Sequence, residues 1–379
     1  MASIVDKDLY FSKGAQKSDS KTSATTSAAS KASEMSIGTN VNKSEYEISN
    51  SSERFQEPMS LDRPIEDLKF KKGVKRGAHL DSIAWMSTNK HVLLGSSNVA
   101  GHMAFGYLQL YGSPQDAVNE KNCSISADYA QGPITQIIAN DKVFLEKFIV
   151  GFRSGLVSLF DSNLSFIKKL QPDMGRVTDL KLNSDHSKVV YSNSNGSIAL
   201  IDMKDFVTEK YFHQAHCSSV MGVDFLAGKS DQFLSIGQEC SIYQWDLRQS
   251  KPASRFTELE TSGTSIKCCI REEFFVTGDI EGSVKLFDIR KPGEELVKFS
   301  SNLSRIHRIK SLGQDDSRLG AVGNEDSIAI FKDHSLKLSE TYIIETDIPV
   351  VRDFFVNDEK TIFVVGCECK KVVPHKVPL

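Results

Sequence analysis

The sequence has no apolar run that approaches the roughly 20 residues needed to span a membrane as a helix. Its first residues, MASIVDKDLYFSKG, also lack the uninterrupted hydrophobic segment of a signal peptide. From these two absences we expect a cytoplasmic or nuclear protein that has no membrane partner.

The chain also lacks a strong excess of charge of either sign. Its 379 residues carry a formal net charge of -3, with 25% charged and 40% hydrophobic side chains, as in an ordinary soluble protein. Such a chain has no electrostatic field that would attract nucleic acid, so direct nucleic-acid binding is not expected. The basic run KKGVKR (71–76) fits a nuclear localisation patch or solvated strand ends, and RIHRIK (305–310) fits a strand that is partly an exposed edge.

A disulfide framework is missing as well. The seven cysteines are an odd, scattered set in a chain without an export signal, so we expect free thiols. Cys367 and Cys369 have Cys-x-Cys spacing, but no second pair or His-x-His is present to complete four zinc ligands. In a strand, both would point to one face. No metal or other cofactor is therefore expected.

No catalytic motif has the required spacing. GVDFLAGKS (222–230) places five residues between its glycines where a phosphate-binding loop needs four, and GFRSG (151–155) has its serine fourth where a nucleophile elbow needs it third. Glu239 beside Cys240 opposes thiolate formation, because the neighbouring charge is negative. We therefore predict that the protein is not an enzyme.

Two segments of different composition divide the chain. Residues 1–58 are dominated by Ser, Thr, Lys, Ala and Asn and hold too few large apolar side chains to offset the entropy of ordering, which predicts a disordered tail. This tail is either a solubilising segment or a target for phosphorylation. Residues 59–379 alternate apolar and polar side chains and form the predicted folded domain.

A short apolar strand recurs along this domain at steps of 41, 44, 42 and 44 residues. It reads LVSLFD up to Asp161, SIALID up to Asp202, SIYQWD up to Asp246, SVKLFD up to Asp288 and SIAIFK up to Lys332. A period of ~40–45 residues is typical of a WD-type β-propeller with four strands in each blade. Further units around YLQLYG (107–112) and from Thr361 onward predict an all-β, seven-bladed WD-repeat β-propeller, in which RPIEDLKF (63–70) is the candidate strand that completes the last blade.

The turn before this recurring strand has lost the aspartate of strong WD repeats. Its equivalents are Ser154, Asn195, Glu239, Glu281 and Glu325. Only the fourth blade pairs such an acid, Glu239, with an upstream His216 and with Trp245 of the single Trp-Asp dipeptide. We therefore expect the propeller to depend more on apolar packing than on that polar network.

Five longer stretches agree in order and spacing with one known family. They are VLLGSSNVAGHMAFGYLQLYGSP (92–114), FLSIGQECSIYQWDLRQSKPAS (233–254), VTGDIEGSVKLFDIR (276–290), PVVRDFFVN (349–357) and VVPHKVPL (373–379). With these stretches the chain resembles the methylosome protein 50 family, the WD-repeat subunits that accompany the type II, symmetric protein arginine methyltransferase. The resemblance implies a non-catalytic scaffold that binds the methyltransferase and helps present arginine-rich substrates such as Sm proteins and histones. Dispersed acidic side chains suit the capture of such substrates, and the candidates are Asp224, Glu239, Glu281 and Glu325.

The same resemblance implies a methyltransferase contact in the first blade. The family has an aromatic residue at the position of Ala104, and Phe105 follows one residue later, on the opposite face of a strand. We predict that His102, Met103 and Phe105 form a cluster that faces the partner, because aromatic and Met side chains are favoured interface anchors. The alternative is that Phe105 is buried between the first two blades.

WDLR (245–248) and FDIR (287–290) indicate a second possible function. A doubled Trp-Asp-x-Arg pattern is typical of substrate receptors of cullin-4 ubiquitin ligases, in which Arg248 and Arg290 would face the ligase. The same pattern also occurs where each arginine merely caps its own blade. The sequence leaves both interpretations open.

Overall fold

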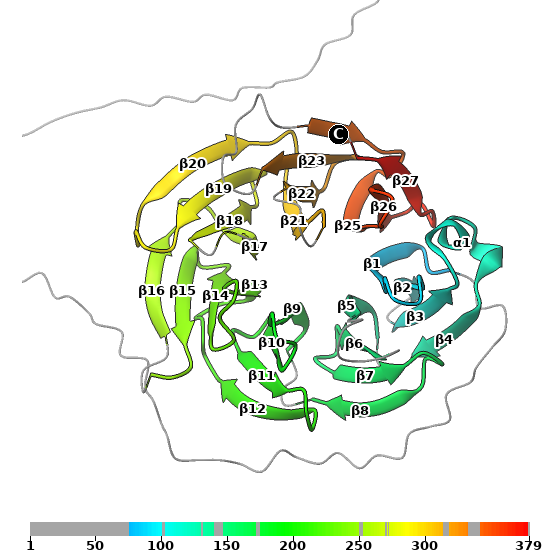
Figure 1. The fold of residues 1–379 in the computed structure, drawn as a ribbon, viewed down its shortest axis with the longest axis horizontal. Helices are drawn as coiled ribbons and strands as arrows, with labels where there is room; N and C mark the ends of the chain where they lie inside the picture. Colours follow the sequence, from blue (N-terminus) through cyan, green and yellow to red (C-terminus); the bar gives the residue numbers. More distant parts are fainter. Residues whose placement is uncertain are drawn as a thin grey trace, which may run out of the picture. The chain divides into compact units, whose positions relative to one another are not determined.

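Short antiparallel β-strands make up almost all of the regular secondary structure that the computed structural model describes (Figure 1). It describes residues 76–377 apart from 101–102, 130–131, 140–146, 172–174, 250–252, 270, 272, 314–317 and 333–341. The predicted disordered tail (1–58), the candidate closing strand (63–70) and His102 lie outside the described residues. Within this part of the chain, no helix is long and apolar enough to cross a membrane.

Five sheets are self-contained blades of four antiparallel strands. The first two consist of β5 (Ile134–Ala139), β6 (Lys147–Phe152), β7 (Val157–Asp161) and β8 (Phe166–Leu170), and of β9 (Val177–Leu182), β10 (Lys188–Asn193), β11 (Ile198–Asp202) and β12 (Val207–Phe212). The next two consist of β13 (Val220–Phe225), β14 (Gln232–Gly237), β15 (Ser241–Asp246) and β16 (Ala253–Glu258), and of β17 (Gly263–Cys268), β18 (Phe274–Asp279), β19 (Ser283–Asp288) and β20 (Glu295–Ser300). The fifth consists of β21 (Ile306–Ser311), β22 (Arg318–Gly323), β23 (Ser327–Lys332) and β24 (Tyr342–Glu345).

The remaining seven described strands form one sheet. They are β1 (His79–Trp85), β2 (Val92–Ala100), β3 (Met103–Tyr111), β4 (Ile125–Tyr129), β25 (Val350–Val356), β26 (Thr361–Cys367) and β27 (Val373–Lys376). A single residue pair, His79 with Cys367, joins β1–β4 to β25–β27. The short helices α1 (Pro114–Val118) and η1 (Glu120–Asn122) connect β3 to β4. The all-β propeller is therefore confirmed, whereas the described residues form five separate blades and not the seven that we expected.

The recurring apolar strand of the sequence is the third strand of each separate blade, namely β7, β11, β15, β19 and β23. It is apolar because both faces of each sheet are covered by neighbouring sheets. Cross-strand aromatic pairs reinforce it: the rings of Phe233 and Trp245 stack with centroids 5.4 Å apart, and those of Phe275 and Phe287 at 5.1 Å. Each such pair contributes roughly 0.2–1 kcal/mol.

Apolar clusters of described residues lie between all neighbouring blades around the ring, where β1–β4 and β25–β27 count as two separate units. The cluster that joins the two ends of the ring packs Leu80, Val92 and Tyr111 against Phe363 and Val365, and all five side chains are fully buried. Burying a large apolar side chain contributes about 1.5–3 kcal/mol. Ring closure therefore rests on packing far more than on the single strand pair.

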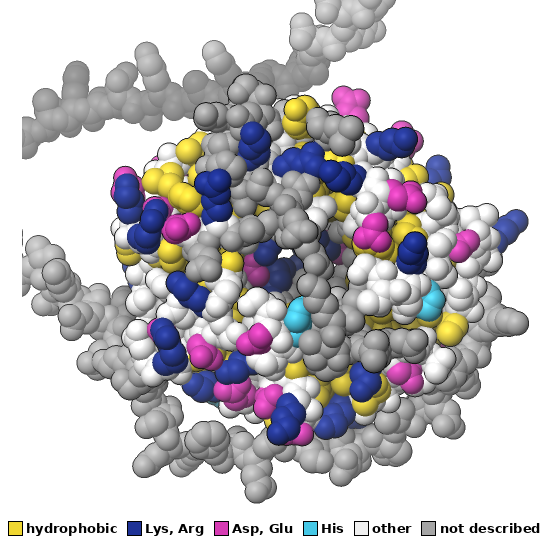
Figure 2. All heavy atoms as spheres, in the orientation of Figure 1, with side chains coloured by type: hydrophobic (Ala, Val, Ile, Leu, Met, Phe, Trp, Pro, Cys, Tyr) yellow, Lys and Arg dark blue, Asp and Glu magenta, His cyan; other side chains and the backbone are white. Residues whose placement is uncertain are grey.

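Polar side chains also link neighbouring inner strands around the centre of the ring. The links are Ser82 Oγ with Ile137 N (3.1 Å), Gln136 Nε2 with Leu180 O (3.0 Å), Asp179 Oδ2 with Val223 N (3.2 Å), Asp224 Oδ2 with Cys268 N (2.8 Å), Ser265 Oγ with Ile309 N (3.2 Å), Lys310 Nζ with Phe354 O (3.1 Å) and Asp353 Oδ2 with Ile83 N (3.0 Å). This series begins and ends on β1, so it closes a ring. The space-filling view shows a hollow at the centre, with side chains of both charge signs inside it (Figure 2).

RIHRIK and Arg76, the described residue of KKGVKR, do not lie where the sequence predicted. RIHRIK forms the inner strand β21, and a bulge between Ile306 and Arg308 leaves both Ile306 and Ile309 buried, so the expected exposed edge is wrong. Arg76, the last residue of KKGVKR, is only 1% exposed, and its Nε donates to Tyr111 Oη at 2.9 Å. Arg76 is therefore a buried anchor and not a solvated strand end.

Candidate interaction surfaces

The blade that contains the Trp-Asp dipeptide, β13–β16, holds a buried polar network. Ser235 Oγ lies 2.7 Å from His216 Nε2 and accepts a hydrogen bond from Trp245 Nε1 at 2.8 Å. His216 Nδ1 contacts the carboxylate of Glu239, to which Ser218 Oγ donates at 2.6 Å. Burial raises the pKa of Glu239, but the contacts with His216 and Ser218 outweigh burial and hold it below its usual value. The predicted grouping of Glu239, His216 and Trp245 is confirmed, and Ser235 is the link that the sequence did not reveal.

Cys240, the neighbour of Glu239, occupies a turn and not a reactive site. Its φ of 68° lies in the left-handed region, and its backbone N–H donates to the carbonyl of Gly237 at 3.2 Å. Glycines with φ of 80–87° stand at the same place in the equivalent turns of other blades, namely Gly155, Gly196 and Gly282. Cys240 thus occupies the glycine position of a repeated turn.

Arg248 and Arg290 occupy equivalent positions after β15 and β19. Nε and Nη2 of Arg248 lie 2.8 and 2.6 Å from the two carboxylate oxygens of Asp246. The same atoms of Arg290 lie 2.9 and 2.7 Å from those of Asp288. The hydrogen bonds from Arg290 lower the pKa of Asp288 to about 2. Because the two arginine side chains are still 65% and 61% exposed, each one caps its own blade and also remains accessible to solvent.

The hairpin of β2 and β3 extends beyond the strands that flank it. Its pairing continues up to Ala100 and Met103, whereas β1 pairs with β2 only as far as Ser97, and β4 pairs with β3 only as far as Gly106. The two hairpin strands have nine residues each, more than any other described strand. We call the described residues 98–100 and 103–105 the hairpin tip.

Phe105 lies on the hairpin tip, opposite Asn98. Its side chain is half-buried and belongs to none of the apolar clusters of the described residues. Among the described residues its ring does not join the cluster between the first two blades, and whether Phe105 is an interface or a core residue stays a prediction. Met103 begins β3, but its side chain and the whole of His102 lie outside the described part, so the predicted cluster stays a prediction.

Two of the four acids expected to attract arginine-rich substrates are engaged inside the protein. Asp224 is 4% exposed and pairs with Lys267 Nζ at 2.7 Å. Glu239 belongs to the buried network described above. For these two residues the expectation is wrong, whereas Glu281 is exposed and Glu325 is half-buried.

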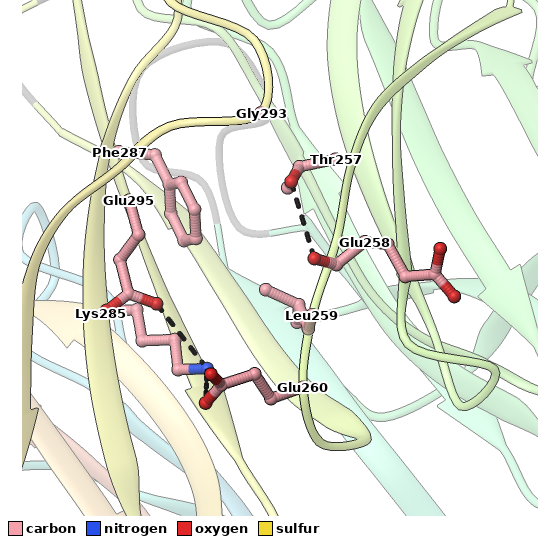
Figure 3. A pocket seen from close by; sticks show the side chains of 8 residues that line it. All are labelled: Thr257, Glu258, Leu259, Glu260, Lys285, Phe287, Gly293 and Glu295. Atoms are coloured by element: carbon pink, nitrogen blue, oxygen red, sulfur yellow. Dashed lines mark hydrogen bonds and ion pairs between the residues drawn. The ribbon is translucent and has the colours of Figure 1, made fainter.

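A small recess between the blades β13–β16 and β17–β20 has a volume of about 180 Å³ (Figure 3). Lys285 projects into it from β19, although this side chain is only 1% exposed, and its Nζ lies 3.5 Å from Glu295 and 3.9 Å from Glu260. The side chain of Glu258 points away from the lysine toward solvent (Figure 3). Carboxylates therefore border this recess and partly enclose one buried cation.

Comparisons with known proteins give two relatives. No model of a known protein family matches the chain. Methylosome protein WDR77 of Xenopus laevis is 29% identical over 211 residues, which cover 53% of this chain and 61% of the relative. Pre-mRNA-splicing factor cwf17 of Schizosaccharomyces pombe is 28% identical over 118 residues, which cover 31% of this chain and 34% of the relative. The chain thus matches less than two thirds of the length of either relative.

The ring of four-stranded blades and the polar network around Trp245 define a WD-repeat β-propeller protein. Within this class the chain resembles the methylosome protein 50 family, and the similarity to the Xenopus methylosome protein confirms the resemblance that the sequence indicated.

Proposed function

We propose that the protein is a non-catalytic subunit of a methylosome-type complex, in which the hairpin tip binds a symmetric-dimethylating protein arginine methyltransferase. The position of Phe105 carries this proposal. Its ring stands on a hairpin that extends beyond both flanking strands, and it packs into none of the described apolar clusters. An aromatic side chain in such a position is a favoured interface anchor. The name of the Xenopus relative, a methylosome protein, supports the same partner.

The rigid support for this contact is a propeller that we infer to have seven blades. The sheet of seven strands divides at its single joining pair, His79 with Cys367, into a four-stranded blade and a three-stranded one. Apolar clusters lie on both sides of each part, as they do for the separate blades. The last blade is then three-stranded within the described residues, and residues 63–70 remain the candidate for its fourth strand.

Arginine-rich proteins such as Sm proteins and histones are the proposed substrates that this scaffold presents. The most exposed acids beside the recess are Glu258 and Glu260, whose side chains are 66% and 76% exposed. Carboxylates bind guanidinium groups through paired, charge-assisted hydrogen bonds. Their ion pairs with Arg255 and Lys298 are exposed to solvent, so these two glutamates supply a candidate contact for substrate arginines.

The experiment that tests the proposed function is purification of the tagged protein from its own cells, followed by identification of the stoichiometric partner. We expect an arginine methyltransferase. Phe105→Ala should weaken its binding by more than about tenfold, as expected when an interface anchor is truncated. Ile167→Ala, which removes a 41% exposed apolar side chain from β8, is the matched control and should leave binding unchanged.

Two results would contradict this assignment. A sharp fall in the melting temperature of Phe105→Ala would show that the ring is part of the core. Recovery of a cullin-4 adaptor in place of the methyltransferase, with binding lost in Arg248→Gln/Arg290→Gln and kept in Phe105→Ala, would identify a ubiquitin-ligase receptor instead. That alternative is favoured by the solvent accessibility of both arginines.

A further inference from the structure

Four arginines gather at one end of the central channel. We call this end the start face, because the inner strands begin there. Since the strands of a blade are antiparallel, the end of each second strand lies at the start face too, as the pairs Ile134 with Phe152 and Ile306 with Gly323 show. Arg176 directly precedes β9, Arg305 directly precedes β21, Arg352 is the third residue of β25, and Arg153 directly follows β6. We call these four residues the arginine rim.

A fifth arginine closes the channel below the rim. Arg308 Nη1 lies 3.0 Å from Gln136 Oε1 and 3.0 Å from Asp179 Oδ1, and its Nη2 donates to Thr135 O at 3.1 Å. These partners lie on β5 and β9, across the ring from β21 (Figure 1). The guanidinium of Arg308 therefore spans the channel and forms the floor of a cup whose mouth is the arginine rim. The ion pair with Asp179 balances its charge.

No ion pair of this kind balances the charge of the arginine rim within the described part of the chain. Among the described residues, none of its four side chains forms a salt bridge. Arg352 lies 3.1 Å from His307 Nε2 and 3.1 Å from Cys367 Sγ, and no carboxylate is among these partners. Within the described part of the chain, the rim therefore has no paired carboxylate, although Arg153 is exposed and the other three side chains are half-buried.

The strand positions place these groups at one face of the ring, where burial and the neighbouring positive charges lower the pKa values of Arg176 and His307. Burial lowers the pKa of Arg176, and the charges of Arg153 and Arg305 lower it further, although Arg305 belongs to a blade across the ring. Burial also lowers the pKa of His307 to about 4, with further contributions from Arg352 and Arg305. His307 is therefore neutral at pH 7 and adds no positive charge of its own.

The carboxylate of Asp81 interacts with two of these arginines, Arg352 and Arg153. Burial raises the pKa of Asp81 to about 6, although Ser97, His79 and Arg352 oppose this shift. Its Oδ2 atom is buried and has no hydrogen-bond partner among the described residues. Glu281 and Glu325 follow second strands at the same face, but neither forms a salt bridge with the rim, so its four guanidinium groups have no ion-pair partner among the described residues.

We propose that the arginine rim is a docking site for an acidic peptide segment of a partner protein. The cations come from four blades on both sides of the channel, so a segment with several carboxylates contacts more of them at once than one small anion does. Guanidinium groups bind carboxylates through paired hydrogen bonds, which suits aspartate and glutamate side chains. The floor made by Arg308 stops the segment from threading through the ring. The hairpin tip lies at the same face, because Ser97 pairs with His79 at the start of β1.

The test measures binding of a fluorescently labelled glutamate octapeptide to the full chain by anisotropy at low ionic strength. Arg176→Gln/Arg305→Gln should weaken binding by about tenfold or more. Lys169→Gln/Lys204→Gln removes the same two charges from exposed lysines outside the rim and should change binding by less than about twofold. The melting temperature of Arg176→Gln/Arg305→Gln should stay the same or rise, because two mutually repelling charges have been removed.

Three outcomes would overturn the proposal. Equal weakening in the two double variants would show attraction by net charge alone. Unchanged peptide binding in Arg176→Gln/Arg305→Gln would exclude the rim. Binding of inorganic phosphate that depends on Arg176 and Arg305, without binding of the peptide, would identify a small-anion site. The peptide assay contains no methyltransferase. Its result therefore stands even if the purification experiment recovers no methyltransferase.

Discussion

Ser235→Ala tests whether the polar network of the Trp-Asp blade contributes to stability. The hydroxyl of Ser235 is the only contact in this network that connects Trp245 Nε1, at 2.8 Å, with His216 Nε2, at 2.7 Å. All three residues are at most 3% exposed, so water cannot replace the lost hydroxyl without a rearrangement of the blade. The substitution removes one oxygen and leaves the apolar packing in place.

The expected cost follows from the two groups that lose their partner. A typical hydrogen bond contributes about 1 kcal/mol net, and a buried donor left without an acceptor costs about 1–3 kcal/mol. Loss of the bond from the indole N–H together with loosening of the imidazole therefore destabilises the folded state by about 3 kcal/mol. With an unfolding entropy of ~2 cal/mol/K per residue, a folded unit of about 300 residues would lose about 5 °C in melting temperature.

Thermal and urea unfolding of Ser235→Ala and Ser158→Ala give the comparison. Ser158 is a matched control, because its Oγ is also buried, in the third strand of the blade β5–β8, but has no hydrogen-bond partner among the described residues. Ser158→Ala should therefore be neutral or slightly stabilising. If both variants shift the midpoint equally, the cost comes from altered packing, and the reasoning about Ser235 is wrong.

Two further predictions concern ring closure and the repeated turn. Asp353 binds Ser82 Oγ at 2.9 Å and Ile83 N at 3.0 Å, and it pairs with Lys310, so Asp353→Asn should cost about 3 kcal/mol by leaving a buried ammonium without its counter-charge. Burial raises the pKa of Asp353, but Lys310 and Arg308 outweigh it and hold the pKa below its usual value. The ion pair therefore contributes fully above the unfolded pKa of about 3.9 and is lost as the pH falls through the lower folded value. Urea unfolding should show a constant difference between parent and variant from about pH 5 to 7, and a difference that persists undiminished at pH 2 would contradict this origin. Cys240→Gly should raise stability by about 0.5–1 kcal/mol, because a left-handed φ of 68° is unfavourable for a residue with a Cβ; a lower melting temperature would mean that packing of the thiol outweighs this strain.

The sequence predicted those parts of the fold that repeat locally. The period of apolar strands located the third strand of each separate blade, because alternation and the acid that ends the strand depend on neighbours a few residues away. In four of the blades that acid accepts a hydrogen bond from the backbone N–H two residues later, and the pairs are Asp161 with Asn163, Asp202 with Lys204, Asp246 with Arg248, and Asp288 with Arg290. This turn explains why aspartate recurs even where tryptophan does not. It also explains why the Trp-Asp-x-Arg pattern alone is weak grounds for a ligase contact.

The local sequence pattern could not predict contacts across the ring, because these contacts depend on the number of blades and on the angle between them. Arg308 looked like part of a basic surface run, yet its guanidinium meets side chains 129 and 172 residues earlier in the chain. The sequence nevertheless contains a signal for the residues that line the channel. One position on each inner strand, at intervals of 43 to 54 residues, carries a residue that is neither aliphatic nor aromatic: Ser82, Gln136, Asp179, Gly222, Ser265, Arg308 and Asp353. No residue type is shared by all of these positions, so a search for a repeated motif misses them. Alignment of the inner strands at these positions would locate the channel, and with it the place where we propose that a charged partner binds the ring.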